Sequence, residues 1–304
     1  MASIVPATFV FCAVLIILTE QANISRRYSP SFEDARVIST ISSSSDVREA
    51  SGICASRLHS NILYTHNDSG DHSHSIYAVD VTSGKQVSKI TINNAVNHDW
   101  EDIACGPCPG GHGDYCIYVA DTGGNVHAAD NTIYRIKEPK TLQSHITVDI
   151  DSTLKFRWDE HNCETLMVDP RAELYVVSKV DGGHGKMVQL PSSAWGSSHR
   201  ATVNDGIHLN GIHSTRNDPV GGDISPTGYE VLIKTIERVN YYYVPDGDYL
   251  KHMTSTPQQL PYHRERQGEG IAWDHNVRGY YTLGEGTHQP IYFFERNPTS
   301  SIIG

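Results

Sequence analysis

The chain has 304 residues and a formal net charge of −11, and 38% of its residues are hydrophobic and 19% charged. This composition is that of an ordinary globular protein, and the repeats described below indicate one domain rather than two. The acidic balance excludes partners that bind through their own negative charge, such as a nucleic-acid backbone or an anionic membrane. Cation binding stays open, although such a charge also serves solubility alone.

The first part of the chain contains an apolar run, residues 9–18, that is too short to span a bilayer comfortably. We interpret residues 1–22 as a secretory signal peptide and predict a secreted, extracellular protein with no membrane partner after signal removal. A short membrane anchor is the alternative. A polar lead, residues 23–35, follows, and its sequon Asn23-Ile24-Ser25 predicts a glycan on Asn23.

Three short runs with the composition of strands recur along the chain, and none has a helical period. The first run of each unit occupies residues 51–54, 101–104, 164–167, 222–225 and 269–272. The second occupies residues 63–65, 117–119, 174–176, 230–232 and 280–282, and the third residues 76–79, 133–136, 187–190, 241–244 and 291–294. A spacing of roughly 45 to 60 residues is typical of propeller blades. The sequence predicts an all-β protein, a β-propeller of five blades, or of six if residues 206–219 hide one.

Each unit needs a fourth, outer strand. Candidates in the first three units are residues 86–92, 147–156 and 201–209, and the fourth unit offers 249–253 or 259–262. The last unit has no such run, whereas residues 36–41 form a lone strand before the first unit. We predict that this strand completes the last unit and closes the ring, because closure protects sheet edges. The predicted propeller spans residues 36–296, and residues 297–304 form a C-terminal tail.

Five cysteines follow the predicted signal peptide, and secretion favours disulfides. Cys105, Cys108 and Cys116 surround one loop, so we predict that Cys116 pairs with Cys108 or with Cys105. A zinc site made from these three lacks an obvious fourth ligand. Cys54 and Cys163 fall on inner strands of units that are not neighbours in a ring, so we do not expect them to pair with each other.

Carboxylates recur in register along the first runs. Two positions before the isoleucine or leucine of each run stand Ser51, Glu101, Glu164, Gly222 and Glu269, and two positions earlier stand Glu49, Asp99, Asn162, Val220 and Gln267. Residues two apart share one side of a strand, and the inner strands of a propeller surround its axis, so these groups should line one channel. Converging carboxylates repel each other unless a cation neutralises them. We predict a divalent-cation site, for Ca²⁺ before other ions, held by Glu101, Glu164, Glu269, Glu49 and Asp99.

The ends of the second runs form another polar column, which strand direction places near the same carboxylates. It includes Asn67, Asp121, Lys179 and Lys234, which we take as candidates for substrate binding. The two lysines have two explanations: structural ion pairs, or groups that hold an anionic substrate beside a metal. Glu138, in contrast, is expected to be an ordinary surface residue.

Several of these segments resemble signatures of a widespread, largely uncharacterised group of β-propeller proteins, many of them secreted and bacterial. The segments are residues 49–52 (Glu-Ala-Ser-Gly), 66–71 (His-Asn-Asp-Ser-Gly-Asp), 99–104 (Asp-Trp-Glu-Asp-Ile-Ala), 222–226 and 267–273. The resemblance implies the fold and hardly the activity. More distantly, the carboxylate-lined channel is similar to calcium-dependent propeller lactonases of the gluconolactonase and regucalcin type, and to propeller phytases. Where bacterial members tend to read Asp-Ile-Gly-Asp-Asn, residues 121–125 read Asp-Thr-Gly-Gly-Asn and lose one acid.

The function expected from the sequence is that of a secreted, acidic protein that binds a divalent cation and has no enzymatic activity, in an extracellular matrix or a mineralised layer. The alternative is a metal-dependent hydrolase of a lactone or a phosphoester. In that case Glu101, Glu164 and Glu269 would bind the metal, and Lys179 or Lys234 the charge of the substrate. The lysines distinguish the two hypotheses, because a pure calcium site has no use for a cation beside it.

Overall fold

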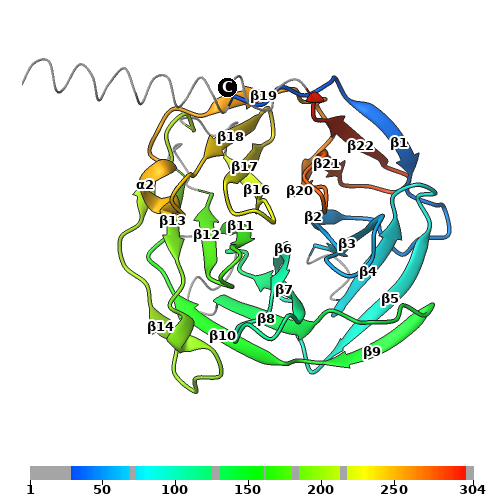
Figure 1. The fold of residues 1–304 in the computed structure, drawn as a ribbon. Coiled ribbons are helices and arrows are strands. Elements are labelled where there is room, and N and C mark those ends of the chain that lie inside the picture. Colours follow the sequence, from blue (N-terminus) through cyan, green and yellow to red (C-terminus); the bar gives the residue numbers. More distant parts are fainter. Residues whose placement is uncertain are drawn as a thin grey trace, which may run out of the picture.

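The computed structural model describes residues 29–68, 73–124, 131–160, 162–179, 185–212 and 218–298. Its strands form five separate sheets arranged around one axis (Figure 1). This arrangement is a five-bladed β-propeller, as predicted, and the six-bladed alternative is wrong. The predicted signal peptide and the sequon at Asn23 lie outside the described residues. Within the described ranges no helix is long and apolar enough to cross a membrane.

Each blade starts at the axis with an inner strand and proceeds outward. The first blade contains β2 (Ala50–Ala55), β3 (Ile62–Asn67), β4 (Ser75–Asp80) and β5 (Gln86–Asn93). The second contains β6 (Trp100–Pro107), β7 (Tyr115–Asp121), β8 (Asn131–Lys137) and β10 (Ser152–Arg157). The third contains β11 (Cys163–Val168), β12 (Leu174–Ser178), β13 (Lys186–Gln189) and β15 (Ile207–His208).

The remaining two blades follow the same plan. The fourth contains β16 (Pro219–Ile224), β17 (Glu230–Thr235), β18 (Val239–Tyr243) and β19 (Gln258–Leu260). The fifth contains β20 (Gly268–Trp273), β21 (Gly279–Gly284) and β22 (Pro290–Glu295), and β1 (Arg36–Thr40) completes it. Two short helical turns, η2 (Ser192–Ala194) and α2 (Tyr249–His252), lie in connections between strands.

Strand β1 closes the ring as predicted. It pairs antiparallel with β22, with Arg36 opposite Phe293 and Thr40 opposite Pro290. The two strands lie side by side at the outer edge of the fifth blade, at opposite ends of the colour scale (Figure 1). The first and last parts of the described chain therefore share one sheet, and the blade edge at β22 is covered.

The predicted outer strands of the second and third units are wrong in one respect, because each run contains two strands. Of residues 147–156, β10 belongs to the second blade, but the preceding strand β9 (His145–Asp149) pairs in parallel with β5 of the first. Likewise β14 (Ala201–Thr202) pairs in parallel with β10 of the second blade, and only β15 joins the third. In the fourth blade the second alternative is confirmed: β19 is the outer strand, and residues 249–252 form helix α2.

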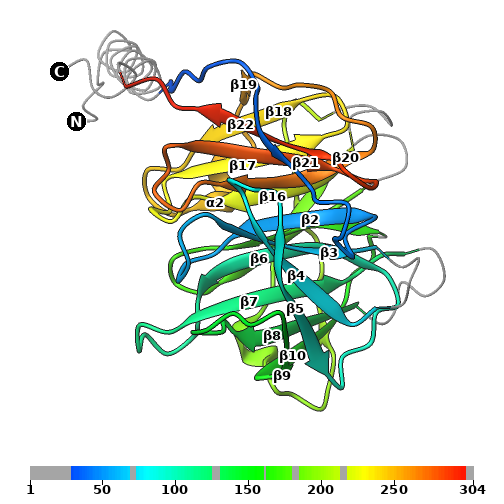
Figure 2. The same ribbon diagram turned by 90° about the vertical axis from the view of Figure 1, so that its right-hand side faces the viewer.

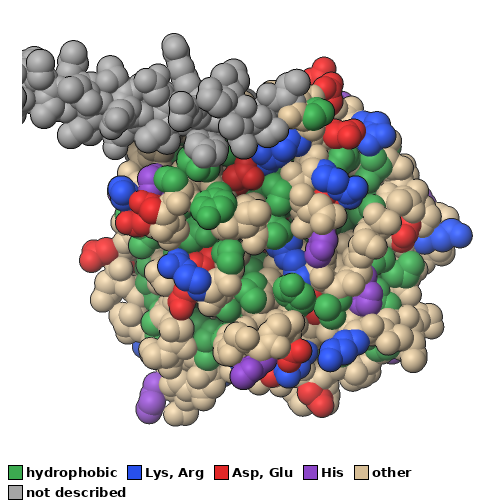
Figure 3. Space-filling model, viewed as in Figure 1, with side chains coloured by type: hydrophobic (Ala, Val, Ile, Leu, Met, Phe, Trp, Pro, Cys, Tyr) green, Lys and Arg blue, Asp and Glu red, His purple; other side chains and the backbone are tan. Residues whose placement is uncertain are grey.

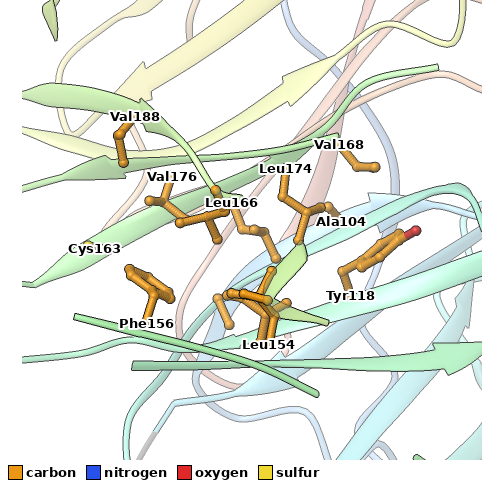
Figure 4. Close-up of a cluster of buried hydrophobic side chains, with 14 of the residues drawn as sticks. Ala104, Tyr118, Leu154, Phe156, Cys163, Leu166, Val168, Leu174, Val176 and Val188 are labelled. Atoms are coloured by element: carbon orange, nitrogen blue, oxygen red, sulfur yellow. The ribbon is translucent and has the colours of Figure 1, made fainter. Parts of the chain in front are cut away.

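The hydrophobic core lies between adjacent blades. Each second strand is almost wholly buried, because the blades pack against both of its faces. One cluster joins the second and third blades, in which Tyr118, Leu154 and Phe156 of the second pack against Leu166 and Val176 of the third (Figure 4). The side view shows the sheets stacked in this way through the molecule (Figure 2).

The inner strands approach one another so closely that glycine is required. A Cβ on Gly52 of β2 would lie 2.8 Å from the Cα atom of Asp102 of β6, and one on Gly221 of β16 would lie 2.4 Å from the carbonyl oxygen of Glu269 of β20. Two buried carboxylates bridge neighbouring inner strands. Asp102 accepts a hydrogen bond from the backbone N–H of Leu166, and Asp223 accepts one from Trp273, both at 2.8 Å.

Both disulfides of the described chain join elements of the first two blades. Cys108 pairs with Cys116, which confirms one of the two predicted alternatives. Cys105 instead pairs with Cys54, an inner-strand bond that was not predicted, with 5.5 Å between the Cα atoms. Cys54 and Cys105 lie on neighbouring strands, β2 and β6, so a comparison of adjacent inner strands could have found the pair. Cys163 is a buried free thiol.

The lead before β1 is not merely polar, because Phe32 is buried in the fifth blade. Its exposed fraction is 7%, and its ring centroid lies 5.0 Å from that of Tyr280 and 6.1 Å from that of Trp273. The guanidinium of Arg296 lies 5.1 Å from the same ring. Phe32 therefore anchors the chain that leads into the closing strand.

Replacing Phe32 with alanine should lower the free energy of unfolding by about 3–5 kcal/mol, the usual cost of deleting a buried phenylalanine. Val37 of β1 is 51% exposed, so Val37→Ala should change it by no more than about 0.5 kcal/mol. Urea denaturation measures both. Equal, small effects of the two substitutions would show that the lead does not stabilise the ring.

Non-reducing peptide mapping should find Cys54 linked to Cys105 and Cys108 linked to Cys116. The first bond closes a loop with a sequence separation of 51 and the second one of 8. The chain-entropy model assigns them about 4 and about 2.5 kcal/mol respectively. The double variant Cys54→Ser/Cys105→Ser should therefore melt at a lower temperature than Cys108→Ser/Cys116→Ser. The reverse order would contradict this assignment.

Candidate functional site

The three predicted glutamates all stand in β-bulges of the inner strands. The register between β6 and β7 shifts between Trp100 and Asp102, that between β11 and β12 between Cys163 and Thr165, and that between β20 and β21 between Gly268 and Gly270. The residues inside these shifts are Glu101, Glu164 and Glu269. Because a bulge re-aims a side chain, the three carboxylates leave the ladder at the same level of the ring.

The fourth blade departs from the sequence alignment. Its bulge lies between Pro219 and Gly221. Val220 therefore occupies the position that the comparison of the repeated first runs gave to Gly222, and Gly222 pairs with Ile233. In the first blade the shift spans Ser51, whose hydroxyl donates to Glu269 at 3.1 Å and to the carbonyl oxygen of Glu101. Among the five bulges, only those of the second, third and fifth blades therefore carry a carboxylate.

The structure brings the three glutamates together with a fourth, Glu285, which directly follows β21 and was absent from the predicted ligand set. We call Glu101, Glu164, Glu269 and Glu285 the axial carboxylate cluster. Burial, and after it the charges of Glu164 and Asp99, raise the pKa of Glu101 well above its ordinary value. Burial and the charge of Glu285 raise the pKa of Glu269 to about 7.

Glu285 completes a pair of interacting carboxyl groups. Burial, followed by the charge of Asp68, raises the pKa of Glu285 to about 7, while its hydrogen-bonding interaction with Glu269 lowers it. Asp99 and Glu49, predicted as ligands, lie at the edge of the cluster: Asp99 is half-buried and Glu49 exposed. Their charges act on Glu101 and Glu285 respectively.

Lys179 is the cation inside this group. Its ammonium lies 2.8 Å from Glu164, whose other hydrogen bond comes from the amide of Asn162 at 2.6 Å. Burial raises the pKa of Glu164 to about 7 in spite of this ion pair. Burial opposes the charged form of Lys179, but the carboxylates around it, Glu164 first, leave its pKa above the ordinary value. Lys179 thus offsets part of the negative charge, and Lys234 is a second positive charge that acts on Glu269.

Lys234 lies deeper than predicted for a substrate-binding group. Its side chain is fully buried, it donates to the carbonyl oxygen of Gly268, and its ammonium lies 3.4 Å from Glu265. Burial lowers its pKa, while Glu265 opposes the shift. A structural ion pair describes these contacts, and the substrate-binding role of Lys234 stays a prediction.

Asn67 and Asp121 hold equivalent turns in the first two blades. The side-chain oxygen of Asn67 accepts from the backbone N–H groups of Arg48 and Glu49, and that of Asp121 from those of His98 and Asp99. Both side chains are buried. They fix the chain that enters each inner strand, and any contact of theirs with a substrate stays a prediction.

Glu138 is not the surface residue that the sequence suggested. Its exposed fraction is 4%, and it accepts hydrogen bonds from the hydroxyls of Ser56 and Tyr64 and from the backbone N–H groups of Arg57 and Leu58. It therefore ties the end of β8 to the loop between β2 and β3. These partners lie about 80 residues away in the chain, so no local pattern indicated the burial.

The donor chemistry of the axial carboxylate cluster suits a hard cation, since carboxylate oxygens are what Ca²⁺ prefers. Across the described ranges, however, no group of three or more His, Cys, Asp or Glu side chains is arranged so that it could hold a metal ion. Gly123 lies against the cluster, because a Cβ there would fall 2.1 Å from Asp99 and 2.3 Å from Glu101. Only glycine leaves room for both carboxylates at this point.

Comparison with known proteins supports the class of fold and nothing finer. No protein-family model matches the chain, and no curated protein does. Among solved structures, a PQQ-bound aldose sugar dehydrogenase from Streptomyces coelicolor is similar at 12% identity with a TM-score of 0.53, covering 89% of this chain and 99% of its own. The allergen Mala s 1 from Malassezia sympodialis is similar at 9% identity with a TM-score of 0.50, covering 81% and 92%. At such identities the likeness shows the fold alone.

The pKa shifts predict a pH dependence of stability. Glu285 and Glu269 have pKa values of about 7 in the folded protein, above the ordinary 4.5, so the folded state holds protons that the unfolded state has released between these values. Their contribution to the free energy of unfolding therefore falls as pH rises from 4.5 to 7. His66, whose pKa burial lowers to about 4, acts in the opposite direction.

Glu285→Gln should isolate the carboxylate contribution, because His66 is common to both proteins. In urea denaturation with EDTA present, the variant should exceed the wild type in midpoint concentration at pH 7.5 and match it at pH 4.5. Glu33→Gln, at an exposed position, is the control and should match the wild type at both values. A gain for Glu285→Gln that is the same at both pH values would rule out carboxylate repulsion as its cause.

Proposed function

We propose that the axial carboxylate cluster binds a divalent cation, and that Ca²⁺ is the ion it favours. The observation that carries this proposal is the convergence of Glu101, Glu164 and Glu269 from three bulges beside Glu285, with pKa values raised by burial and by one another. Lys179 and Lys234, which both act on Glu269, are two positive charges beside four carboxyl groups. A cation would remove the repulsion that the cluster contains, so binding would stabilise the fold.

Binding would have to change the cluster, because the described side chains do not stand as a metal-holding group. Protons held by Glu101 and by the Glu269–Glu285 pair would leave as the ion enters, since a carboxylate binds a metal in its deprotonated form. Proton release is therefore a signature of this site that an ordinary surface carboxylate, already ionised at neutral pH, does not give.

The setting that we propose is extracellular and the role non-enzymatic, that of a calcium-binding protein of a matrix or a mineralised layer. The two disulfides support an oxidising compartment. The net charge of −11 supports an affinity for cations in general.

Lys179 favours a second candidate, a metal-dependent hydrolase of a lactone or a phosphoester. Its side chain is 34% exposed and lies beside Glu164, where an anionic substrate next to a cation could reach it. Calcium-dependent turnover of an aryl lactone or an aryl phosphate that Lys179→Met abolishes, with the calcium response kept, would establish this activity.

Thermal melting with and without CaCl₂ tests the proposal. At 100 times its dissociation constant, Ca²⁺ should raise the free energy of unfolding of the wild type by about 2.7 kcal/mol. Glu164→Gln keeps the shape and removes one charge, so it should weaken this response and leave or raise the melting temperature in EDTA. Addition of CaCl₂ to unbuffered wild type at pH 7 should also release protons, measured by pH-stat titration.

Glu33→Gln, exposed and remote from the axis, is the matched control and should respond to calcium like the wild type. A wild type whose melting ignores millimolar calcium would refute the cation site, and the hydrolase with it. If both variants lose the calcium response equally, the response arises from diffuse surface charge and not from the axial carboxylate cluster.

A further inference from the structure

A second polar feature lies at the other end of the axis, where the inner strands finish. A cavity of about 370 Å³ is lined by residues at the C-terminal ends of these strands or just beyond them, including Arg57, Pro107, Val168, Ile224 and His275. The axial carboxylate cluster lies at their N-terminal ends, in the bulges. All five blades contribute to this cavity, and its volume is within the range of small-molecule sites.

Arg57 lines this cavity, and its guanidinium is only partly hydrogen-bonded. Its exposed fraction is 9%, and its Nε–H donates to the carbonyl oxygen of Cys105 at 3.0 Å. Nη1 is buried and has no hydrogen-bond partner among the described residues. Within the same residues, no carboxylate forms a salt bridge with this guanidinium. A buried donor of a charged group is costly to leave without a partner, so we expect a water molecule or a ligand in the cavity to complete the hydrogen bonding of this guanidinium.

The acidic groups near this cavity are already engaged. Asp169 lines it, but its carboxylate pairs with Arg171 at 2.7 Å and accepts backbone hydrogen bonds from Arg171 and Glu173. Asp223 lies within the electrostatic reach of Arg57 and is held by the backbone N–H of Trp273. Arg57 is therefore the charge that a ligand in the cavity could pair with.

Beside Arg57 the lining combines apolar side chains with the polar Ser225 and His275, and the Nδ1 atom of His275 lies 3.2 Å from the carbonyl oxygen of Ser56. Val168, Ile224 and Pro107 line the wall, and Tyr115, 36% exposed, stands at the rim. Basic side chains also lie among hydrophobic ones near the middle of the ring's face in Figure 3. One guanidinium fork matches one planar carboxylate, whereas a phosphate dianion would face Asp223 and Asp169 with only one cation to offset it.

We propose that this cavity binds a small organic carboxylate, with the carboxylate group on the guanidinium of Arg57 and an apolar body against Val168, Ile224 and Tyr115. The site is separate from the axial carboxylate cluster and needs no cation. It makes the two ends of the axis complementary in charge: one end carries excess negative charge and the other receives an anion.

Benzoate is a suitable probe, since it joins a planar carboxylate to a small apolar ring. In titrations followed by two-dimensional amide NMR, benzoate should bind saturably and shift the amides of Gly106 and Ser225, which line the cavity, but not that of Gly123 beside the axial cluster. Benzamide, of the same shape without the charge, should bind at least tenfold more weakly. This arm needs only the wild type, so it holds even if a variant fails to fold.

Arg57→Gln should weaken benzoate about tenfold or more, because a hydrogen bond to a charged group is lost. Tyr115→Ala should weaken it several-fold by removing the apolar rim. Arg48→Gln, an exposed arginine beside the opposite end of the axis, is the matched control and should leave benzoate affinity unchanged.

Several outcomes would overturn the proposal: no saturable benzoate binding, benzamide binding as tightly as benzoate, shifts centred on Gly123, or an affinity that Arg57→Gln does not change. Inorganic phosphate binding at Arg57 more tightly than benzoate would overturn the assignment to carboxylates. None of these results depends on calcium, so the cation site stands or falls separately.

Discussion

The close approach of the five inner strands is the constraint on which the structure depends. Gly52 and Gly221 allow neighbouring backbones to meet, and the buried carboxylates of Asp102 and Asp223 hold them by accepting backbone N–H groups from the next strands. Burial raises the pKa of both, to about 6 for Asp223, while the N–H donors oppose the shift. Without these contacts the inner strands would lie further apart, and the side chains at each end of the axis would not come close to one another.

The charged groups of this narrow ring lie in the bulges and at the ends of the inner strands. At one end, bulges turn Glu101, Glu164 and Glu269 out of the ladder and toward one another. At the other end the strands finish around Arg57, whose guanidinium the protein only partly satisfies. The same packing that stabilises the fold thus brings carboxylates together at one end and buries a guanidinium at the other, where solvent, protons or ligands must compensate their charge.

The fold could be predicted from the sequence because its signals are local: short apolar runs, turns and a repeat. The column of glutamates followed from spacing alone. The features that the sequence did not predict depend on contacts between distant segments of the chain. The bulge at Val220 shifts the fourth blade out of the alignment, the bond between Cys54 and Cys105 requires two strands to be compared, and the burial of Glu138 arises from a loop of another sheet. Arg57 carries no motif, since its role depends on what its neighbours leave unpaired.

The two added strands, β9 and β14, have a consequence for how such a ring could arise or change. Each lies in the chain between the third and the outer strand of one blade, yet it extends the outer edge of the blade before, in parallel with β5 or β10. The repeat in the sequence and the unit in space are therefore offset. A duplication or exchange of one sequence unit would carry away a neighbour's edge strand, so these blades cannot be recombined as independent modules.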